Sequence, residues 1–278
     1  MYGDLMPLFP YAGGKRRSVK FISKYLRRTS TYAEPFFGSG AVFCHMVNKS
    51  LAKKFVINDI NRNVIGVYEA IKNDSASLCE ELSDLCSIFN GLSAGKKESM
   101  FFRIRDEVSE NYNAAKYMLI LKTRFGAMHK TDAFGNACDT SGHGILSNRV
   151  VSCDREQIRL WQKALENTEI CRCDFESVPI SDSDAIIFCD PPYHASVIAY
   201  GADFSKNDQL RCLNWCARVA VRPDITVLLS NRDAKGVFSK RVGSDVLIDH
   251  YEIPYTAGEN VRNTETLLVW NQKPNLTK

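Results

Sequence analysis

Residues 185–193 have the sequence AIIFCDPPY, and this stretch decides how the rest of the chain can fold. Its first five residues form a short apolar run that is typical of a buried parallel strand. Two successive prolines cannot continue a strand, so the chain must turn after Asp190. Because open α/β sheets bind ligands at the carboxyl ends of their strands, Asp190 and Tyr193 form a candidate site. Taken alone, these residues are explained equally well by an ordinary turn that ends a strand.

An earlier stretch, residues 31–47, predicts a strand, a glycine turn and a helix. The turn contains Gly38 and Gly40, and such a turn lets a nucleotide-like ligand lie against bare backbone at the helix N-terminus. About 20 residues later a second short strand ends in Asp59, at the distance where such folds place a carboxylate on ribose hydroxyls. The combination predicts a cofactor site.

Residues 11–15, with the sequence YAGGK, are the first motif of the chain. Two glycines let the backbone approach a ligand closely, and the flanking tyrosine and lysine can then reach across it. A plain glycine turn before a helix is the simpler interpretation of this motif alone. Apolar residues at helical spacing over residues 18–26 predict that helix.

The pattern changes between residues 75 and 165. Helices are predicted around residues 77–89, 98–108 and 114–125, and a loop or hairpin around residues 126–148, which are rich in Gly, Asn, Ser and Thr. Sheet patterns return at residues 170–175, 226–232, 246–253 and 266–270, the last two as an antiparallel pair, and a helix follows Ser205. We therefore expect one domain formed by residues 1–74 and 166–278, with residues 75–165 inserted into it.

Composition is that of a soluble globular protein: 45% of the 278 residues are hydrophobic and 24% are charged. No stretch approaches the roughly 18 apolar residues of a membrane span, and the first residues lack the pattern of a secretory signal. We therefore expect a cytoplasmic protein. The net charge of +4 permits binding to a polyanion without requiring it. The ten cysteines include no paired CxxC units, so we expect reduced thiols and no metal site.

Five motifs in order resemble the DNA adenine N6-methyltransferases of the family typified by the bacterial methylase Dam (the D12, alpha group). They are residues 11–15 (YAGGK), 34–40 (EPFFGSG), 58–61 (NDIN), 173–175 (CDF) and 190–193 (DPPY). The resemblance implies an α/β fold: a Rossmann-like S-adenosylmethionine-dependent methyltransferase sheet with an inserted, mainly helical target-recognition domain. Residues 75–165 would be that DNA-binding domain.

The same resemblance implies the roles of individual residues. The cofactor would be S-adenosylmethionine, with Asp59 on its ribose and Asp174 and Phe175 at its adenine. The full set of implied cofactor contacts is Tyr11, Lys15, Glu34, Pro35, Phe36, Gly38, Ser39, Gly40, Asp59, Ile60, Asp174, Phe175 and Asp190. The implied catalytic residues are Asp190, Pro191, Pro192 and Tyr193.

Two departures from the family pattern bear on these expectations. Relatives commonly begin the first motif with tryptophan, and Tyr11 keeps an aromatic face there. In the insertion, residues 123–128 (TRFGAM) differ from the usual pattern, so no recognition sequence can be carried over. The expected partner is double-stranded DNA; neither a membrane nor an obligate protein partner is implied, and a companion restriction nuclease stays an open alternative. The candidate DNA-binding residues are Lys122, Arg124, Lys130, Asn136 and Arg149.

We therefore expect a site-specific enzyme that methylates the exocyclic amine of a flipped adenine in duplex DNA. Three alternatives stay open at this point. Enzymes that act on protein glutamine or on RNA usually carry Asn at the position of Asp190, and cytosine N4-methyltransferases typically carry Ser. A catalytically idle DNA-binding module would not need all of the polar groups present in these motifs.

Overall fold

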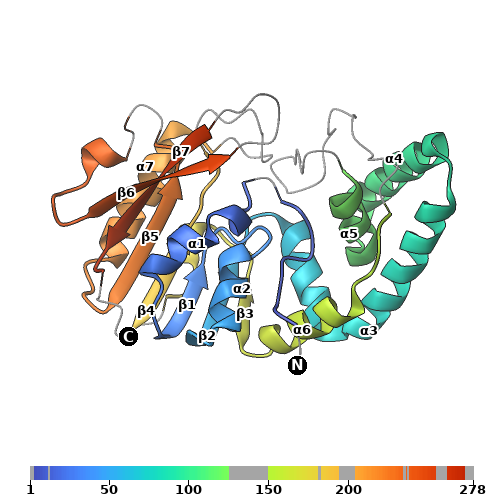
Figure 1. Ribbon diagram of the computed structural model, residues 1–278, viewed down its shortest axis with the longest axis horizontal. Coiled ribbons are helices and arrows are strands. Elements are labelled where there is room, and N and C mark those ends of the chain that lie inside the picture. The colour runs from blue at the N-terminus through green and yellow to red at the C-terminus, as the bar shows by residue number, and fades with distance from the viewer. Residues whose placement is uncertain are drawn as a thin grey trace. The chain divides into compact units, whose positions relative to one another are not determined.

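A computed structural model describes residues 3–11, 13–124, 150–180, 183–193, 204–233, 236, 238–254 and 262–272. The chain divides into two compact units (Figure 1). The described residues of one fall within Met1–Gly14 and Ile60–Glu166, and those of the other within Lys15–Asp59, Asn167–Val197 and Phe204–Lys278. Within these described ranges, no helix combines the length and apolar character that crossing a membrane requires.

The second unit is built on a seven-stranded sheet with the order β3-β2-β1-β4-β5-β7-β6 (Figure 1). The first five strands are parallel, and β7 runs antiparallel to both β5 and β6. The strands are β1 (Thr29–Glu34), β2 (Ala52–Asn58), β3 (Thr168–Cys171), β4 (Ala185–Cys189), β5 (Ile225–Asn231), β6 (Leu247–Pro254) and β7 (Arg262–Trp270). The expected α/β fold class and the antiparallel final pair are confirmed.

The strand order reverses direction between β1 and β4, which pair directly with Ala33 opposite Ile187. Such a switch point is where open α/β sheets form a crevice for a ligand. The glycine turn follows β1, and the DPPY corner follows β4. Sheet topology therefore brings two motifs that are about 150 residues apart in the chain to the same edge, as expected for strand ends at a switch point.

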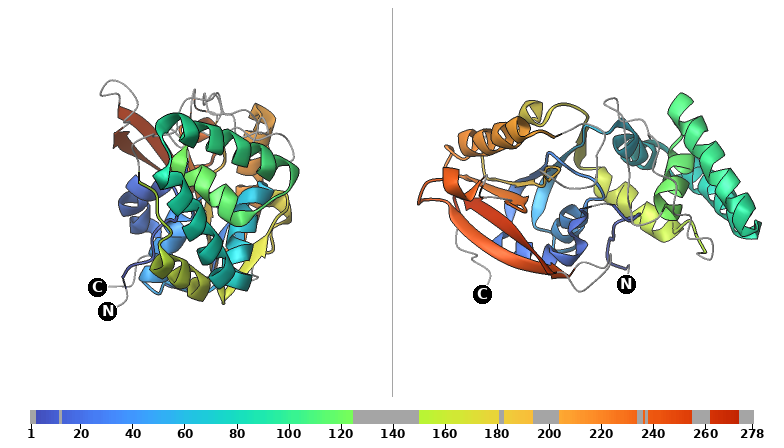
Figure 2. Two further views of the ribbon diagram at one scale, coloured as in Figure 1. Left: turned by 90° about the vertical axis from the view of Figure 1, so that its right-hand side faces the viewer. Right: turned by 90° about the horizontal axis from the view of Figure 1, so that it is seen from above.

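Helices cover both faces of this sheet (Figure 2). Phe43 of α2 (Ala41–Asn48) packs on Phe55, whereas Trp215 and Cys216 of α7 (Lys206–Val219) join a core cluster with Val56. Successive side chains of a strand point to opposite faces, so α2 and α7 lie on opposite sides of β2. The remaining short helices of this unit are η1 (Lys15–Arg17), α1 (Val19–Ile22), η2 (Ser23–Tyr25), η4 (Phe175–Ser177) and η6 (Ser239–Arg241).

The first unit is helical in its described residues. Its helices are α3 (Arg62–Gly91), α4 (Ala94–Glu110), α5 (Ala114–Thr123) and α6 (Arg155–Leu165), with α3 packed on α5 and α6, and α4 on α5. The first two helices predicted in the insertion lie within α3 and α4; the third coincides with α5, which ends at Thr123, two residues before the predicted end. However, α3 starts earlier than expected, because the Asn61 side chain caps its N-terminus, and it bends at Asp74 (φ −151°, ψ 73°).

Helix α6 was not predicted from the sequence, although its signals are present. Asp154 accepts a hydrogen bond from the Gln157 N–H and so caps the helix. Ile158, Trp161 and Leu165 are all buried and recur at helical spacing. The Trp161 indole also donates to the Met6 carbonyl (2.8 Å), which ties the N-terminal segment to α6 within this unit.

Candidate active site

The corner after β4 is held from two neighbouring elements. Gln209 of α7 donates a 2.5 Å hydrogen bond to the Pro192 carbonyl, and Asn231 at the end of β5 donates to the Gln209 side chain (3.1 Å). Gln209 and Asn231 are both buried. The prolines limit the backbone of the corner, and these two amides fix where its carbonyl points. Asp190 and Tyr193 therefore project from a rigid turn.

One buried lysine meets the corner at Asp190. The Lys15 ammonium lies 2.7 Å from Asp190 Oδ1 and 3.8 Å from Glu265 Oε2 of β7. Lys15 is only 4% exposed, so this cation depends on carboxylates rather than water for its stabilisation. Glu265 is in turn held by the Tyr251 hydroxyl (2.6 Å), and Ser230 Oγ lies 3.1 Å from that hydroxyl.

These surroundings alter the acidity of Asp190. Burial raises the pKa of its carboxyl to about 6; the Glu265 charge acts in the same direction, and the Lys15 ammonium opposes both. Asp190 is therefore an anion at neutral pH but becomes protonated in mild acid. An anion can accept hydrogen bonds from an amine, so the first chemical feature of this corner is a hydrogen-bond acceptor.

The second chemical feature of this corner is the aromatic face of Tyr193. The Lys15 ammonium lies 4.8 Å from the centre of its ring, and the Arg232 guanidinium carbon lies 5.8 Å from the same centre. Both distances fall within the range of cation–π attraction, which holds a ring in place. Burial and the nearby Asp190 and Glu265 charges keep the pKa of the phenol well above its ordinary value, so Tyr193 stays neutral.

The glycine turn and Asp59 form a connected group. The Gly38 N–H donates to Asp59 Oδ2 (2.9 Å), and the Phe37 N–H donates to the Asn58 carbonyl (2.9 Å). Gly38 and Gly40 have φ of 52° and 65°, a region that other residues adopt at a cost. Asn58 donates from its amide to the Pro35 carbonyl (2.9 Å) and so closes the turn against β2. Of the remaining predicted residues here, Ser39 is buried and Ile60 is 61% exposed.

Glu34 lies beneath this turn, at the end of β1. Its carboxyl is 2% exposed and accepts the Tyr32 hydroxyl hydrogen (2.8 Å). Burial raises the pKa of Glu34 to about 8, and the hydrogen bond from Tyr32 only partly offsets this. Glu34 therefore carries a proton at neutral pH and acts as a neutral core residue.

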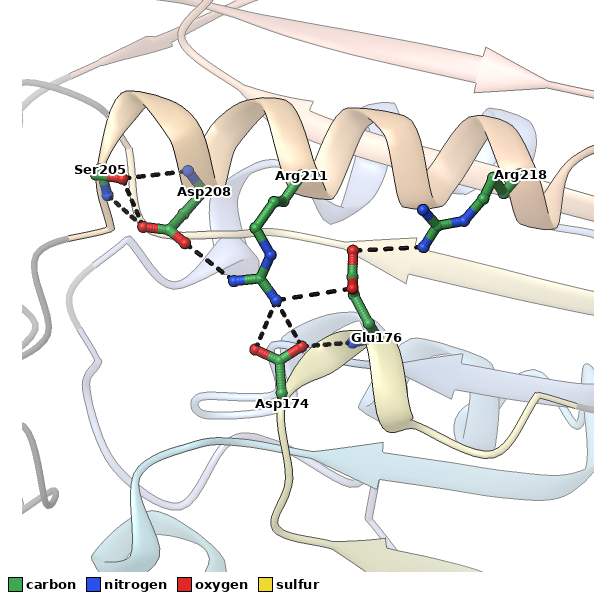
Figure 3. Close-up of polar contacts among 6 residues, drawn as sticks. All are labelled: Asp174, Glu176, Ser205, Asp208, Arg211 and Arg218. Carbon is green, nitrogen blue, oxygen red and sulfur yellow. Dashed lines mark hydrogen bonds and ion pairs between the residues drawn. The ribbon is translucent and has the colours of Figure 1, made fainter.

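Arg211 of helix α7 holds Asp174 (Figure 3) and also lies against the ring of Phe175. Both Asp174 oxygens accept from Arg211 Nη2 at 3.0 Å, and Asp174 also caps the following turn through the Glu176 N–H. The Arg211 guanidinium lies 4.9 Å from the Phe175 ring centre, and Phe36 packs on the same ring at 5.3 Å. The predicted residues of this motif are thus connected to one arginine that the sequence did not single out.

Tyr11 belongs to the first unit. Its ring lies 5.7 Å from the Arg124 guanidinium, and Arg124 Nη2 donates to the Pro10 carbonyl (3.2 Å). Lys122 donates to the Leu8 carbonyl (3.0 Å). Two predicted DNA-binding residues therefore contact the segment that carries Tyr11. The other three, Lys130, Asn136 and Arg149, lie outside the described residues.

The residues that sequence reasoning missed sit mostly on the last strands of the sheet. Glu265 and Tyr251 face each other in the β6–β7 register, and both side chains are buried. The sequence gives no clear signal for Glu265, because residues 264–266 are all polar and only residues 267–270 form the apolar run, and nothing in the sequence pairs it with Lys15. In the parts of the chain that the structure describes, no group of His, Cys, Asp and Glu could hold a metal ion, and nine cysteines are free.

Comparison of the sequence with known proteins identifies the family of this chain. Residues 11–246 match the model of the D12 class N6 adenine-specific DNA methyltransferases. The chain is 28% identical to the type II methyltransferase M.MjaIII of Methanocaldococcus jannaschii, over 85% of this chain and 88% of that protein. It is 26% identical to a DNA adenine methylase of Vibrio cholerae, over 80% of each chain. It is also 25% identical to the type II methyltransferase M.CviBI of Paramecium bursaria Chlorella virus NC1A, over 76% of this chain and 78% of that one. The chain therefore belongs to the D12 class of N6 adenine-specific DNA methyltransferases.

Proposed function

We propose that this chain transfers the methyl group of S-adenosylmethionine to N6 of an adenine swung out of duplex DNA, with Asp190 as the acceptor for the amine. The observation that carries this proposal is Asp190 itself. It is an anion on a rigid corner, 2.7 Å from the Lys15 ammonium and beside the Tyr193 ring. An acid at this position, in place of Asn or Ser, favours the adenine amine over the alternatives named above.

The residues present fit this cofactor. Asp59 offers carboxylate oxygens at the end of β2 with one of them already held by Gly38, which suits a pair of ribose hydroxyls. The backbone at Gly38 and Gly40 is bare, and the exposed Ile60 side chain offers an apolar surface. We propose that the cofactor is held by these residues together with Tyr11, Lys15, Pro35, Phe36, Ser39, Asp174 and Phe175. Since the Glu34 side chain is buried, we expect Glu34 to contribute through its main chain.

Adenine N6 is a poor nucleophile because its lone pair is delocalised into the ring. A hydrogen bond from N6 to Asp190 draws that lone pair toward the attacking direction, and the Pro191 carbonyl is a candidate second acceptor. When bound, S-adenosylmethionine supplies a methyl group made electrophilic by its positive sulfur. The N6–methyl bond would form as the methyl–sulfur bond breaks and the neutral thioether leaves, and Asp190 would accept the proton that N6 then loses.

Tyr193 and the rigid corner contribute by placement. A base stacked on the Tyr193 ring recovers part of the few kcal/mol that flipping costs. Alignment of the reacting groups can contribute about 7–11 kcal/mol in favourable cases. Pro191 and Pro192 limit the motion of Asp190 and Tyr193, which is how we expect the corner to achieve that alignment.

Contact with DNA phosphates is proposed for basic residues of the inserted region. Lys122, Lys130 and Arg149 are the basic candidates, and Asn136 is a polar candidate for a hydrogen bond to the DNA. Phosphate contacts release counterions, so the affinity for duplex DNA should fall steeply as salt is raised. An affinity that does not change with salt would contradict a duplex substrate. We also propose that the protein resides in the cytoplasm and that a restriction nuclease is its companion.

The deciding experiment is transfer of a tritiated methyl group to plasmid DNA, followed by digestion to nucleosides. We expect the label in N6-methyldeoxyadenosine. Label in N4-methyldeoxycytidine, or transfer to RNA or to protein in place of DNA, would contradict the proposal. Binding of DNA and cofactor without any transfer would instead indicate an idle module.

A further inference from the structure

Lys15 is a single cation placed between two carboxylates that come from different parts of the sheet. Asp190 follows β4, and Glu265 lies on β7, with distances of 2.7 Å and 3.8 Å to the ammonium. The motifs of the family explain Lys15 and Asp190 but give no role to Glu265. Removing a carboxylate from water is costly, so a buried acid beside this lysine calls for an explanation.

Glu265 is held in place by the sheet rather than by Lys15 alone. Tyr251 is its direct partner across the β6–β7 pair, and the Tyr251 hydroxyl donates to Glu265 Oε2 at 2.6 Å. Ser230 of β5 lies 3.1 Å from the same hydroxyl. The Tyr251 ring is itself stacked on Phe21, with 4.3 Å between ring centres. Three elements therefore fix the position of the second carboxylate.

Charged and titratable side chains from several elements surround Asp190. Lys15 from η1 and Arg232 after β5 are cations that both lie against the Tyr193 ring, and Glu265 from β7 is a second acid. Glu34 from β1 is kept neutral by burial at neutral pH, and the nearby phenols of Tyr193 and Tyr251 have pKa values raised by burial. Asp190 therefore competes with another carboxylate for one ammonium. The Glu265 charge adds to the proton affinity of Asp190.

We propose that Glu265 is a positioning residue for methyl transfer: by sharing the Lys15 ammonium, it prevents that lysine from fully neutralising Asp190 and so keeps Asp190 a strong acceptor for the target amine. This inference rests on the function proposed above. It assigns Glu265 no contact with the substrate; the residue acts through Lys15 and Asp190. Without it, Lys15 would pair with Asp190 alone, and the acceptor would be weaker.

The test compares Glu265→Gln with wild type. Gln keeps the size of the side chain and can still accept from Tyr251, but it removes the charge. We expect kcat to fall several-fold and the acidic limb of the kcat profile to move to lower pH, because Asp190 becomes a weaker base. Glu265→Asp retains the charge and should restore most of the wild-type profile. Asp249→Asn is the matched control: it also removes an acid of β6–β7 that accepts from a tyrosine, Tyr25, and should leave the profile unchanged.

A second readout does not depend on activity. Carbon-13 NMR of the aspartate carboxyls, with Asp190 assigned through Asp190→Asn, follows the protonation of Asp190 directly. We expect Asp190 to titrate at lower pH in Glu265→Gln than in wild type. Identical titration curves and identical pH profiles in the two proteins would overturn the role of Glu265. Failure of wild type to methylate DNA would instead refute the proposed function, and the NMR comparison would still show separately whether Glu265 raises the proton affinity of Asp190.

Discussion

The backbone N–H of Gly38 donates a 2.9 Å hydrogen bond to a carboxylate oxygen of Asp59, so the glycine turn after β1 and the acid after β2 form one unit of structure. We expect Asp59→Asn to weaken cofactor binding about tenfold, because a neutral amide is a poorer acceptor for ribose hydroxyls and loses a charged hydrogen bond worth roughly 1.5–3 kcal/mol. Calorimetric titration with S-adenosylhomocysteine measures this. Asp106→Asn, on the exposed side of α4, is the control, and equal affinity of both variants would refute the role of Asp59.

Asp190→Ala should lower kcat for methyl transfer at least about a hundredfold, within the usual effect of losing a proton-accepting group. The fold should survive, because Lys15 keeps Glu265 as a counterion. In wild type, kcat should decline as pH falls through about 6, where Asp190 takes up a proton. Single-turnover assays on plasmid DNA across this range check both statements. Wild-type-like methylation by the alanine variant would remove Asp190 from the mechanism.

Glu34 makes the stability of the protein depend on pH in a direction opposite to that of most acids. Its pKa rises from the ordinary value of 4.5 to about 8 because the folded protein buries it, so the folded state binds the proton more tightly than the unfolded state. The resulting stabilisation is complete below pH 4.5 and is lost as pH rises through about 8. In Glu34→Gln the free energy of unfolding should therefore decrease less between pH 5 and pH 8 than in wild type.

Urea unfolding at several pH values measures that difference. Glu110→Gln removes an exposed acid at the end of α4 and serves as the control. A Glu34→Gln variant whose stability changes with pH just as wild type does would show that Glu34 is not held in its neutral form.

Arg211 should influence cofactor binding, although it belongs to no motif. It binds both oxygens of Asp174 and lies over Phe175, so Arg211→Gln frees both groups. Since Arg211 is 43% exposed, we expect a modest effect of about threefold on the cofactor Kd. Arg218→Gln is a close control, because Arg218 lies on the same helix and contacts only Glu176 in this network (Figure 3). Equal affinities of the two variants would argue against a role for Arg211.

Arg124 has two alternative roles, a structural contact within the protein or a contact with a DNA phosphate, and the salt dependence of DNA binding distinguishes them. It is 4% exposed and donates to the Pro10 carbonyl, so we expect Arg124→Gln to lower thermal stability without changing the salt dependence of DNA binding. Loss of a direct phosphate contact would instead reduce the slope of log K against log salt by about 0.9. A reduced slope with unchanged stability would favour the DNA contact that the sequence suggests.

Much of the sheet was predictable because its strands carry strong local signals. Residues 185–189 are uniformly apolar and stop at two prolines, and the glycines at 38 and 40 interrupt the chain where the backbone needs positive φ. Helix α6 and the first half of α3 were missed. Their charged and amide residues obscured the apolar spacing, and their asparagine and aspartate caps were not recognised.

The site was predictable only where its residues lie in motifs. Lys15 and Asp190 were both singled out, but their 2.7 Å contact is a product of tertiary structure. Glu265, Tyr251, Gln209 and Arg211 have roles that depend on partners far away in the chain, and no local pattern encodes such pairing. Buried polar residues of this kind are found by asking which groups satisfy one another inside the protein.

The placement of Glu265 on β7 has a consequence for shortened copies of such a gene. The family match ends at residue 246, before β6 and β7 begin, so a product terminated there would retain every diagnostic motif. It would nevertheless leave β5 as an unpaired sheet edge, exposing backbone groups that promote aggregation. It would also lack the second counterion of Lys15. To decide whether a gene of this class encodes an intact enzyme, one should therefore check that the final strand is present as well as the motifs.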